Sequence, residues 1–293
     1  MTGCGWRTLV TEAHESLSLA DECMVIQDGE EKKEVPISQL RTVLITSDRG
    51  SISLPLMARL AEENINLIIC DGRHNPKCNM SAVNTNGETA GRLMDQSGWT
   101  GRKKDAVWKQ IVSMKIHMQE SLLQKIGRPD SAILHNYRKE IQTGDATNRE
   151  AVAARVYFRA LFGPDFERFC GDSTNAALNY GYTILCSAFN RSVSMHGYST
   201  ALGIHHCSRQ NPYNLSCDLM EPFRPFVDEM VLRNAGRELD RSYKDEFIML
   251  LHGVCRYGGR KITIADAIEA FTLDVCRAMS EHGQKMKEVG FAE

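Results

Sequence analysis

The sequence lacks any hydrophobic run long enough to cross a membrane. No stretch reaches the roughly 18–20 uncharged apolar residues that a bilayer-spanning helix needs. The first ten residues, MTGCGWRTLV, also lack the basic and apolar segments of a secretory signal. We therefore expect a cytoplasmic protein with no membrane association. A composition of 42% hydrophobic and 25% charged residues is typical of a soluble globular chain.

Paired cysteines are also missing, because the ten cysteines are scattered and none forms a CxxC pair. The nearest approach to a zinc pattern is Cys70, His74 and Cys78, whose spacing is not that of a zinc knuckle. In a reducing compartment such cysteines are mostly small buried hydrophobic residues. The sequence therefore indicates neither a disulfide framework nor a thiolate zinc site.

A strong positive charge, the simplest indicator of a nucleic-acid-binding protein, is absent as well. The formal net charge is −2. Residues 1–90 carry 8 basic and 13 acidic residues, whereas the remainder carries 27 and 24. Any contact with DNA would therefore need local basic patches in the second part or the assembly of several subunits.

The hydrophobic pattern divides the chain into two parts. In the first part, β-branched or alternating runs predict strands, one segment has a helical period, and polar segments predict turns. The strands are expected at 6–11, 22–27, 41–46 and 65–70, the helix at 54–63, and the turns at 28–33, 47–50 and 71–77. From about residue 101 the apolar period becomes 3.6, which predicts helices and no strands. These helices are expected at 104–126, 130–143, 149–162, 172–195, 218–234, 244–254 and 263–287.

These patterns predict an α+β protein of two domains. We expect a small N-terminal β-rich domain at 1–83, a connection at 84–101 and a larger all-α domain at 102–293. The edge strands of the β-rich domain could pair with another chain.

The most informative segment is CDLMEPFRP at 217–225, which follows GIHH at 203–206 by about a dozen residues. Asp218 and Glu221 are three positions apart, so on a helix their carboxylates lie on one face. A histidine from the preceding turn could complete a hard-metal site of oxygen and imidazole ligands, with the Arg224 cation beside it. Such groups are the ones needed to hold a metal against a phosphodiester.

Each of these residues also has an ordinary structural interpretation. The acids could form a solvated helix face, or Arg224 could pair with one of them. The two histidines could be hydrogen-bonded structural residues or, beside Cys207, part of a zinc site. Glu150 lies in the first turn of the helix at 149–162, for which Thr147 or Asn148 is the expected cap. Acids are favoured there by the helix dipole alone.

The apolar neighbours of the acids weaken the structural interpretation. Leu219, Met220, Phe223 and Phe226 make much of the segment apolar, so its acids are expected near buried surface. An unpaired buried carboxylate is costly, and a divalent cation would offset that cost. The residues alone still leave a pairing of Arg224 with either acid open.

Six ordered motifs carry a resemblance to a known family. They are GWRT at 5–8, CDGRHNP at 70–76, REAVAARVYF at 149–158, LNYGY at 178–182, GIHH at 203–206 and DLMEPFRP at 218–225. Over essentially its whole length the chain resembles the CRISPR-associated integrase and endonuclease family of spacer acquisition, and within it the type II branch. The resemblance implies antiviral adaptive defence. Short foreign DNA fragments would be inserted into a CRISPR array by attack of a 3′-hydroxyl on a phosphodiester at the repeat ends.

The resemblance also implies a metal site, which belongs to the α-helical domain. The family's ligands fall by motif on Glu150, His206 and Glu221, with Mg²⁺ or Mn²⁺ as the cofactor. Asp218 is expected as a supporting catalytic group. His205 stays an alternative ligand, although the spacing from Gly203 favours His206.

Partners are implied as well. We expect double-stranded DNA as spacer precursor and repeat array, a homodimer, and a small ferredoxin-like Cas partner that completes a heterohexamer. A type II effector nuclease and a ring-shaped DNA-end-binding protein would be further partners. DNA should be read mainly through phosphate contacts and shape. The candidate DNA contacts are Arg224, Arg155, Arg209, Lys103 and Lys104, followed by Arg102, Lys109, Lys115, Arg138, Lys139, Arg256, Arg260 and Lys261.

Two other functions remain open at this point. One is a metal-dependent nuclease that hydrolyses branched DNA with water as the nucleophile. The other is a non-catalytic DNA-binding scaffold whose acids are structural. The same residues would serve the nuclease and the integrase, so only the reaction product separates these two.

Overall fold

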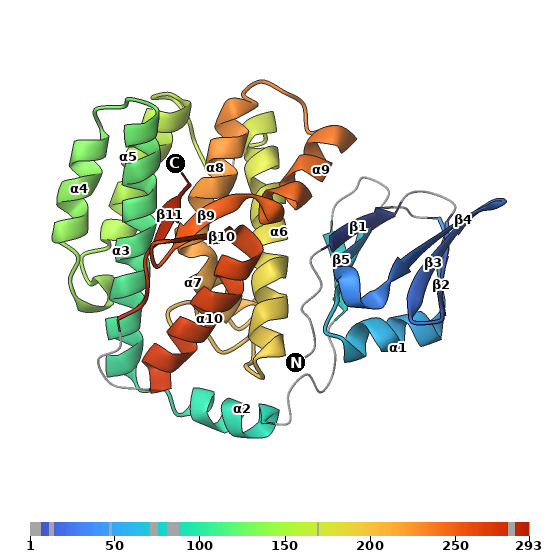
Figure 1. Ribbon diagram of the computed structural model, residues 1–293. Coiled ribbons are helices and arrows are strands. Elements are labelled where there is room, and N and C mark those ends of the chain that lie inside the picture. Colours follow the sequence, from blue (N-terminus) through green and yellow to red (C-terminus); the bar gives the residue numbers. More distant parts are fainter. Residues whose placement is uncertain are drawn as a thin grey trace. The chain divides into compact units, whose positions relative to one another are not determined.

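The computed structural model describes residues 7–11, 15–46, 49–70, 76–80, 88–168, 170–280 and 285–292. These residues form two compact units (Figure 1). The first unit contains the described residues up to Thr89 and Ser194–Gly197, and the second contains Ala90–Val193 and the described residues from Tyr198 onward. Strands therefore dominate the N-terminal region and helices the C-terminal region, which confirms the predicted α+β class. The finer domain boundaries stay a prediction.

The first unit contains two four-stranded sheets, a 3₁₀ turn and one α-helix. Its elements are β1 (Arg7–Thr11), β2 (Ser16–Ala20), β3 (Cys23–Asp28), β4 (Glu31–Pro36), η1 (Ile37–Gln39), β5 (Leu40–Ile45), β6 (Ser51–Ile52), α1 (Leu54–Glu62), β7 (Asn66–Cys70) and β8 (Pro76–Met80). One sheet has the order β1-β5-β7-β8 and the other β4-β3-β2-β6. β5 pairs in parallel with both β1 and β7.

The apolar runs of β5 and β7 explain this parallel arrangement. Parallel strands are buried on both faces, so they read as continuous hydrophobic runs. Val43 of β5 and Leu67 of β7 are fully buried, together with Leu56 and Leu60 of α1. The helix begins at Ser53, whose hydroxyl accepts the Leu56 N–H.

The hydrophobic pattern did not predict β2, β4, β6 or β8, and the reason is clearest for β4. The segment 28–33 was predicted to be a turn, but β4 already begins at Glu31 and pairs with β3. Its first four residues, EKKE, are exposed at the sheet edge. Charged residues are common on edge strands, so the segment has the composition of a turn. Of the predicted turn at 71–77, residues 71–75 lie outside the described residues, as do Gly5 and Trp6.

The second unit contains the other described helices and a small sheet, except that Thr89 at the start of α2 and Ser194–Met195 at the end of α6 belong to the first unit. Its α-helices are α2 (Thr89–Ser97), α3 (Gly101–Lys125), α4 (Ser131–Lys139), α5 (Arg149–Phe162), α6 (Ser173–Met195), α7 (Asn214–Met220), α8 (Arg224–Arg233), α9 (Arg241–Met249) and α10 (Ile264–Ser280). Short 3₁₀ turns lie at η2 (Thr143–Asp145), η3 (Glu221–Phe223) and η4 (Leu250–His252). The long helix α3 is the central helix of this unit, because it contacts α4, α5, α7, α8 and α10.

The expectation of a second part without strands is wrong. β9 (Val254–Tyr257), β10 (Arg260–Thr263) and β11 (Val289–Phe291) form a three-stranded sheet of order β10-β9-β11. The turn between β9 and β10 is Gly258-Gly259, and both glycines have positive φ, as a two-residue hairpin turn requires. Thr263 caps α10, since its hydroxyl accepts the Asp266 N–H. The helix ends at Ser280, and the predicted continuation to 287 is wrong because 285–288 have no helical assignment.

The predicted single helix over 218–234 is broken in the structure. α7 starts earlier, at Asn214, and ends at Met220, after which η3 leads into α8. Pro222 and Pro225 explain the break, because proline lacks the N–H and its ring clashes with the carbonyl four residues earlier. Asp218 and Glu221 therefore do not lie on one continuous helix, and their carboxylates have different partners.

The expected connection at 84–101 contains α2, whose buried Gln96 side chain holds it to the segment after α6. The Gln96 amide donates to the carbonyls of Ser199 and Leu202, at 2.8 Å each. Its oxygen accepts the Ser199 N–H at 2.8 Å. Gln96 therefore fixes the start of the loop that leads to the two histidines.

The cysteines of the described ranges are all free thiols, but the expectation that they are mostly buried is wrong. Cys70, Cys255 and Cys276 are buried, whereas Cys78, Cys170 and Cys207 are exposed. Across the same ranges, no helix combines the length and apolar character that a bilayer crossing requires.

Three helices of the second unit meet at a buried carboxylate. Asp228 of α8 accepts hydrogen bonds from the hydroxyls of Tyr157 in α5 and Tyr182 in α6. Burial raises the pKa of Asp228 to about 6, and the two hydroxyls and the Arg224 guanidinium oppose this rise. The carboxylate thus joins three helices but is costly to ionise.

We expect Asp228→Asn to be as stable as the native chain or more stable at about pH 8, by at most about 3 kcal/mol. Below about pH 4 the carboxyl is protonated in both folded and unfolded chains, so Asp228 adds no pH dependence there. As the pH rises to about 6, the unfolded chain releases its proton first, and the native free energy of unfolding falls. Chemical denaturation at several pH values measures this, and a variant less stable than the native chain at pH 8 would contradict it.

Candidate functional site

Two glutamates that are distant in sequence share one buried ammonium group. The Lys115 Nζ from α3 lies 2.6 Å from Glu150 Oε1 and 2.5 Å from Glu221 Oε2. Lys115 is 7% exposed and Glu221 is 3% exposed, whereas the Glu150 side chain is 23% exposed. Lys115 was predicted as a candidate DNA contact, but the structure buries its ammonium between two carboxylates.

The charges of this cluster support one another. Burial opposes ionisation of Glu221, but the Arg224 guanidinium and the Lys115 ammonium lower its pKa to about 2. Burial likewise opposes the charge on Lys115, and Glu221 and Glu150 overcome this to raise its pKa. Glu221 and Lys115 are therefore both charged at neutral pH.

Glu150 is positioned by a capping carboxylate that the sequence did not reveal. The Asp145 oxygens accept the backbone N–H groups of Arg149 and Glu150, at 2.8 and 2.9 Å. Asn148 occupies the cap position but makes no capping hydrogen bond through its side chain. The expected cap by Thr147 or Asn148 is therefore replaced by a carboxylate two to three residues earlier. It satisfies the otherwise unbonded first N–H groups of α5.

Asp218 organises the loop that carries the two histidines. Its carboxylate is fully buried and accepts the backbone N–H groups of Ile204, His205 and His206, at 2.6 to 3.0 Å. Asp218 Oδ1 also lies 2.6 Å from His206 Nδ1. This hydrogen bond is the main cause of a raised His206 pKa, although burial opposes it. The arrangement holds Nδ1 of His206 as the hydrogen-bond donor. The other ring nitrogen, Nε2, is then the one suited to bind a metal ion.

The glycine of the GIHH turn is required by the same carboxylate. A Cβ at Gly203 would lie 2.2 Å from the His206 carbonyl oxygen and 2.9 Å from Asp218 Oδ2. A larger residue would therefore push the loop away from Asp218. This contact is the physical reason for a glycine three residues before the histidine.

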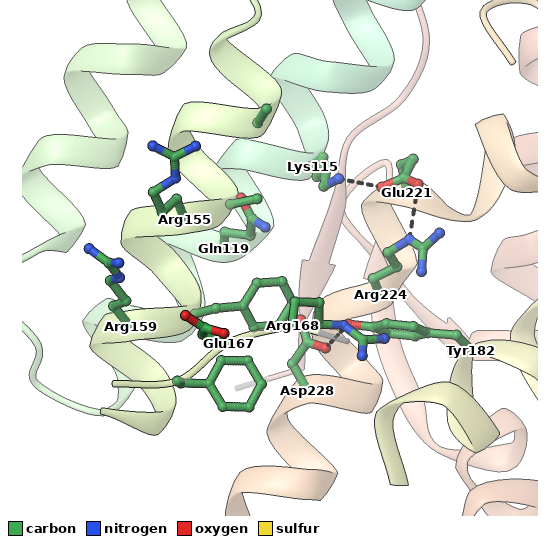
Figure 2. Close-up of a pocket in the computed structure, with 14 residues that line it drawn as sticks. Lys115, Gln119, Arg155, Arg159, Glu167, Arg168, Tyr182, Glu221, Arg224 and Asp228 are labelled. Carbon is green, nitrogen blue, oxygen red and sulfur yellow. Dashed lines mark hydrogen bonds and ion pairs between the residues drawn. The ribbon is translucent and has the colours of Figure 1, made fainter. Parts of the chain in front are cut away.

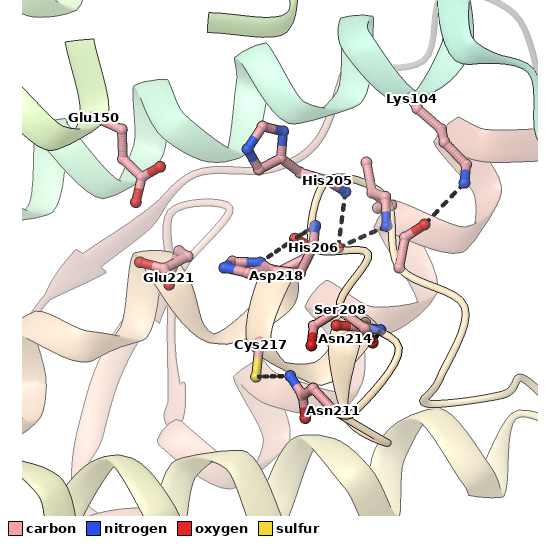
Figure 3. Close-up of polar contacts among 12 residues, drawn as sticks. Lys104, Glu150, His205, His206, Ser208, Asn211, Asn214, Cys217, Asp218 and Glu221 are labelled. Carbon is pink, nitrogen blue, oxygen red and sulfur yellow. Dashed lines mark hydrogen bonds and ion pairs between the residues drawn. The ribbon is translucent and has the colours of Figure 1, made fainter. Parts of the chain in front are cut away.

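His205 and His206 have different surroundings. The His205 ring stacks on Trp108 with a centroid separation of 4.3 Å and an interplanar angle of 1°. The His206 ring instead points toward Glu221 in Figure 3, where Glu150 and Glu221 face the same region. The geometry therefore favours His206 over His205 as a partner of the glutamates.

Three of the candidate DNA-contacting residues make hydrogen bonds within the chain. Arg224 Nε donates to Glu221 Oε1 at 3.0 Å, and its guanidinium lies 4.4 Å from the Tyr182 ring centroid. Lys103 donates to the carbonyls of Met279 and Ser280, and Lys104 to that of Gly203. Arg224, Lys103 and Lys104 thus hold parts of the chain in place. Glu221 is the acid that pairs with Arg224, a pairing that the residues alone left open. These three residues and the candidates Arg155 and Arg209 all line cavities: Arg155 and Arg224 line one, Lys104 and Arg209 a second, and Lys103 a third.

The cavity beside Glu221 has a volume of about 650 Å³. Four arginines line it with Lys115, and aromatic rings and small residues of α5 form much of the remaining wall (Figure 2). The arginines are Arg155, Arg159, Arg168 and Arg224, and the aromatic residues are Phe158, Phe166 and Tyr182. Three acidic residues, Glu167, Glu221 and Asp228, also line the cavity, so its five basic side chains outnumber its acidic ones. This excess of basic charge suits a phosphate-bearing ligand.

The glutamates and His206 offer the donors of a divalent-cation site, with one obstruction. The Lys115 ammonium lies within contact distance of one oxygen from each glutamate, so both carboxylates face the same position. Two carboxylates and an imidazole are suitable ligands for Mg²⁺ or Mn²⁺. In the part of the chain that the structure describes, however, no three acidic, histidine or cysteine side chains are arranged to hold a metal ion. A cation would fit only after Lys115 moves.

The sequence contained a signal for the role of Lys115. In the helix at 104–126, Lys115 falls on the apolar period with Trp108, Ile111 and Met118, all of which are buried. A lysine on the buried face of a helix needs a buried anion as a partner. That position could have separated Lys115 from the exposed basic residues.

Comparisons with known proteins agree with this architecture. A family model described as CRISPR associated protein Cas1 matches residues 8–254. The chain is 34% identical over 253 residues to a CRISPR-associated endonuclease Cas1 of Neisseria meningitidis serogroup C (strain 8013), covering 84% of this chain and 83% of the relative. The chain therefore belongs to the CRISPR associated protein Cas1 family, which confirms the resemblance at the level of the family.

Two solved structures share the fold. A casposase bound to its integration product has a TM-score of 0.79 and 17% identity, covering 96% of this chain and 92% of that one. A Cas6-RT-Cas1–Cas2 complex has a TM-score of 0.74 and 18% identity, covering 99% of this chain and 36% of that one. At these identities the likeness concerns the fold alone.

We expect Asp218→Ala to release the histidine loop. The variant removes the acceptor of three backbone N–H groups, so these amides should exchange with solvent about tenfold faster or more. Hydrogen–deuterium exchange of residues 204–206 measures the effect, and the amides of α10 serve as the internal control. Unchanged exchange in the loop would show that Asp218 does not hold it.

Proposed function

We propose that this protein is a metal-dependent DNA integrase that inserts short DNA fragments into a CRISPR array. The observation that carries the proposal is the pairing of Glu150 and Glu221 around Lys115 beside an arginine-lined cavity, with His206 held by Asp218 and pointing toward Glu221 (Figure 3). Membership of the Cas1 family and the shared fold with a casposase bound to an integration product support it. The type II branch is part of the same proposal.

In the proposed reaction, the 3′-hydroxyl of the fragment attacks a phosphodiester at the edge of a repeat. One phosphodiester breaks and one forms, and the leaving 3′-oxygen takes up the proton that the attacking hydroxyl releases. No nucleotide hydrolysis is needed. The barrier lies in the crowding of negative charge at phosphorus and in the weak nucleophile.

The side chains of the chain have distinct parts in this proposal. Glu150, Glu221 and His206 would hold a Mg²⁺ or Mn²⁺ ion, which would lower the pKa of the attacking hydroxyl and neutralise developing charge. Asp218 fixes the His206 ring through Nδ1. Arg224 keeps Glu221 oriented and ionised, and the cavity arginines bind the phosphates that flank the reacting one.

The partner proposal is separate from the chemistry. One solved structure with this fold is a complex that contains Cas2, which supports a small ferredoxin-like Cas partner for this chain. Such a bridge between two homodimers would place two reaction sites at a fixed distance. Cytoplasmic localisation, the heterohexamer, the effector nuclease and the ring-shaped DNA-end-binding protein belong to the same proposal.

A nuclease that uses water in place of the 3′-hydroxyl is the second candidate. The word endonuclease in the description of the Neisseria relative favours it. The same side chains would serve both reactions. The product distinguishes them, because integration joins the fragment to the array and hydrolysis only cleaves.

We expect Glu221→Gln to lower strand transfer about a hundredfold or more while DNA binding survives, because the variant removes a charge from the ion's ligand set. The assay is transfer of a labelled 3′-hydroxyl fragment into a repeat-bearing plasmid, with and without the small partner, scoring joined against cleaved product. Glu229→Gln is the matched control. Glu229 lies on α8 and pairs with Lys125 of α3 and Arg233 of α8. Undiminished transfer in the Glu221 variant would remove the site assignment.

The two histidines should differ in the same assay. His206→Ala should lose about a hundredfold in metal-dependent transfer, because its ring is the imidazole ligand. His205→Ala should lose about tenfold or less, because its ring packs on Trp108. The reverse order would exchange their roles.

A further inference from the structure

The two glutamates assigned to the metal are already neutralised without it. Lys115 Nζ bridges Glu150 and Glu221, and Arg224 binds the other oxygen of Glu221. Two negative charges thus face two positive charges in a mostly buried cluster. A divalent cation added to this cluster would leave an excess of two positive charges.

The ammonium and a metal ion also compete for the same oxygens. Lys115 Nζ lies 2.5 to 2.6 Å from one oxygen of each glutamate. Mg²⁺ demands oxygen ligands at about 2.0–2.1 Å, so both cations cannot occupy the space between those two oxygens. The Lys115 ammonium must leave before both glutamates can bind one ion.

The structure offers a place for the displaced ammonium. Lys115 lines the cavity of about 650 Å³ together with Arg155, Arg159 and Arg168. A lysine ammonium sits on a flexible four-carbon stem and can follow a phosphate, whereas Arg224 is fixed to Glu221 and Tyr182. A DNA phosphate in the cavity would attract the ammonium and also supply the negative charge that the loaded site lacks.

We propose that Lys115 is a resident counter-ion that keeps the glutamates from binding a divalent cation until DNA phosphate draws it into the cavity. Metal and DNA then bind cooperatively, because each removes the obstacle to the other. This inference rests on the proposed function. It goes further by assigning Lys115 a positioning role that a purely structural ion pair would not have.

The test measures Mn²⁺ binding by electron paramagnetic resonance of free Mn²⁺, under conditions in which no strand transfer takes place. The full chain is titrated alone and with a duplex whose 3′ ends carry dideoxynucleotides. Lys115→Met should bind Mn²⁺ about tenfold more tightly or more than the native chain in the absence of DNA, because the competing charge is gone. The duplex should tighten native binding about tenfold or more, and the variant's about threefold or less.

Two matched variants serve as controls. Lys115→Arg keeps the charge and should bind Mn²⁺ about as the native chain does. Lys125→Met removes a lysine of the same helix that pairs with Glu229, and it should leave Mn²⁺ affinity unchanged. Lys115→Met affinity equal to or weaker than that of the native chain would overturn the proposal.

Folding is monitored by thermal melts in chelator and in excess Mn²⁺. Lys115→Met should gain more thermal stability from Mn²⁺ than the native chain does, since the ion replaces the missing charge. If Lys115→Met does not fold even with excess Mn²⁺, Lys115→Gln is titrated in its place. Failure of both to fold with Mn²⁺ would assign Lys115 a structural role and reject the inference.

Failure of this inference differs from failure of the proposed function. Glu221→Gln should weaken Mn²⁺ binding in every condition. If it does so while Lys115→Met does not tighten binding, only the counter-ion role is lost. If Glu221→Gln leaves Mn²⁺ binding intact, the metal site itself is misassigned.

Discussion

The burial of carboxylates inside a helical unit is the constraint on which the site depends. Asp218, Glu221 and Asp228 are all 3% exposed or less. A buried carboxylate requires a compensating partner, and each of these has a different one. Asp218 has backbone N–H groups, Glu221 has two cations, and Asp228 has two tyrosine hydroxyls. These pairings fix which segments meet, so the acids organise the fold as well as the candidate chemistry.

The pairings also explain how distant segments are brought into one site. Lys115 from α3 joins α5 to the turn after α7, and Asp218 joins α7 to the loop after α6. Because α3 packs against both α5 and η3, its buried face brings the two glutamates together. The proline-induced break at 221–223 turns Glu221 toward α3 while Asp218 faces the loop.

Much of the fold could be predicted from the pattern of hydrophobic residues. The helices at 149–162 and 173–195 are long and periodic, and their predicted bounds agree with α5 and α6 within a residue. The charged edge strand β4 and the Gly258-Gly259 hairpin were missed, because their local composition is that of a turn or loop. The candidate residues Glu150, His206 and Glu221 came from ordered motifs. Asp145 and Lys115 were missed as their partners, because those contacts exist only after the helices pack.

The local charge of the site also accounts for a feature of the composition. The chain has a net charge of −2, which does not suggest a protein that acts on DNA. The arginines at 155, 159, 168 and 224 nevertheless line one cavity, where low-dielectric walls concentrate their field. A phosphate senses this field and not the sum over the surface, because exposed charges are screened within about 8 Å at physiological salt. The relevant quantity is therefore the charge within reach of the glutamate pair, and Lys115 contributes to it from inside the cluster.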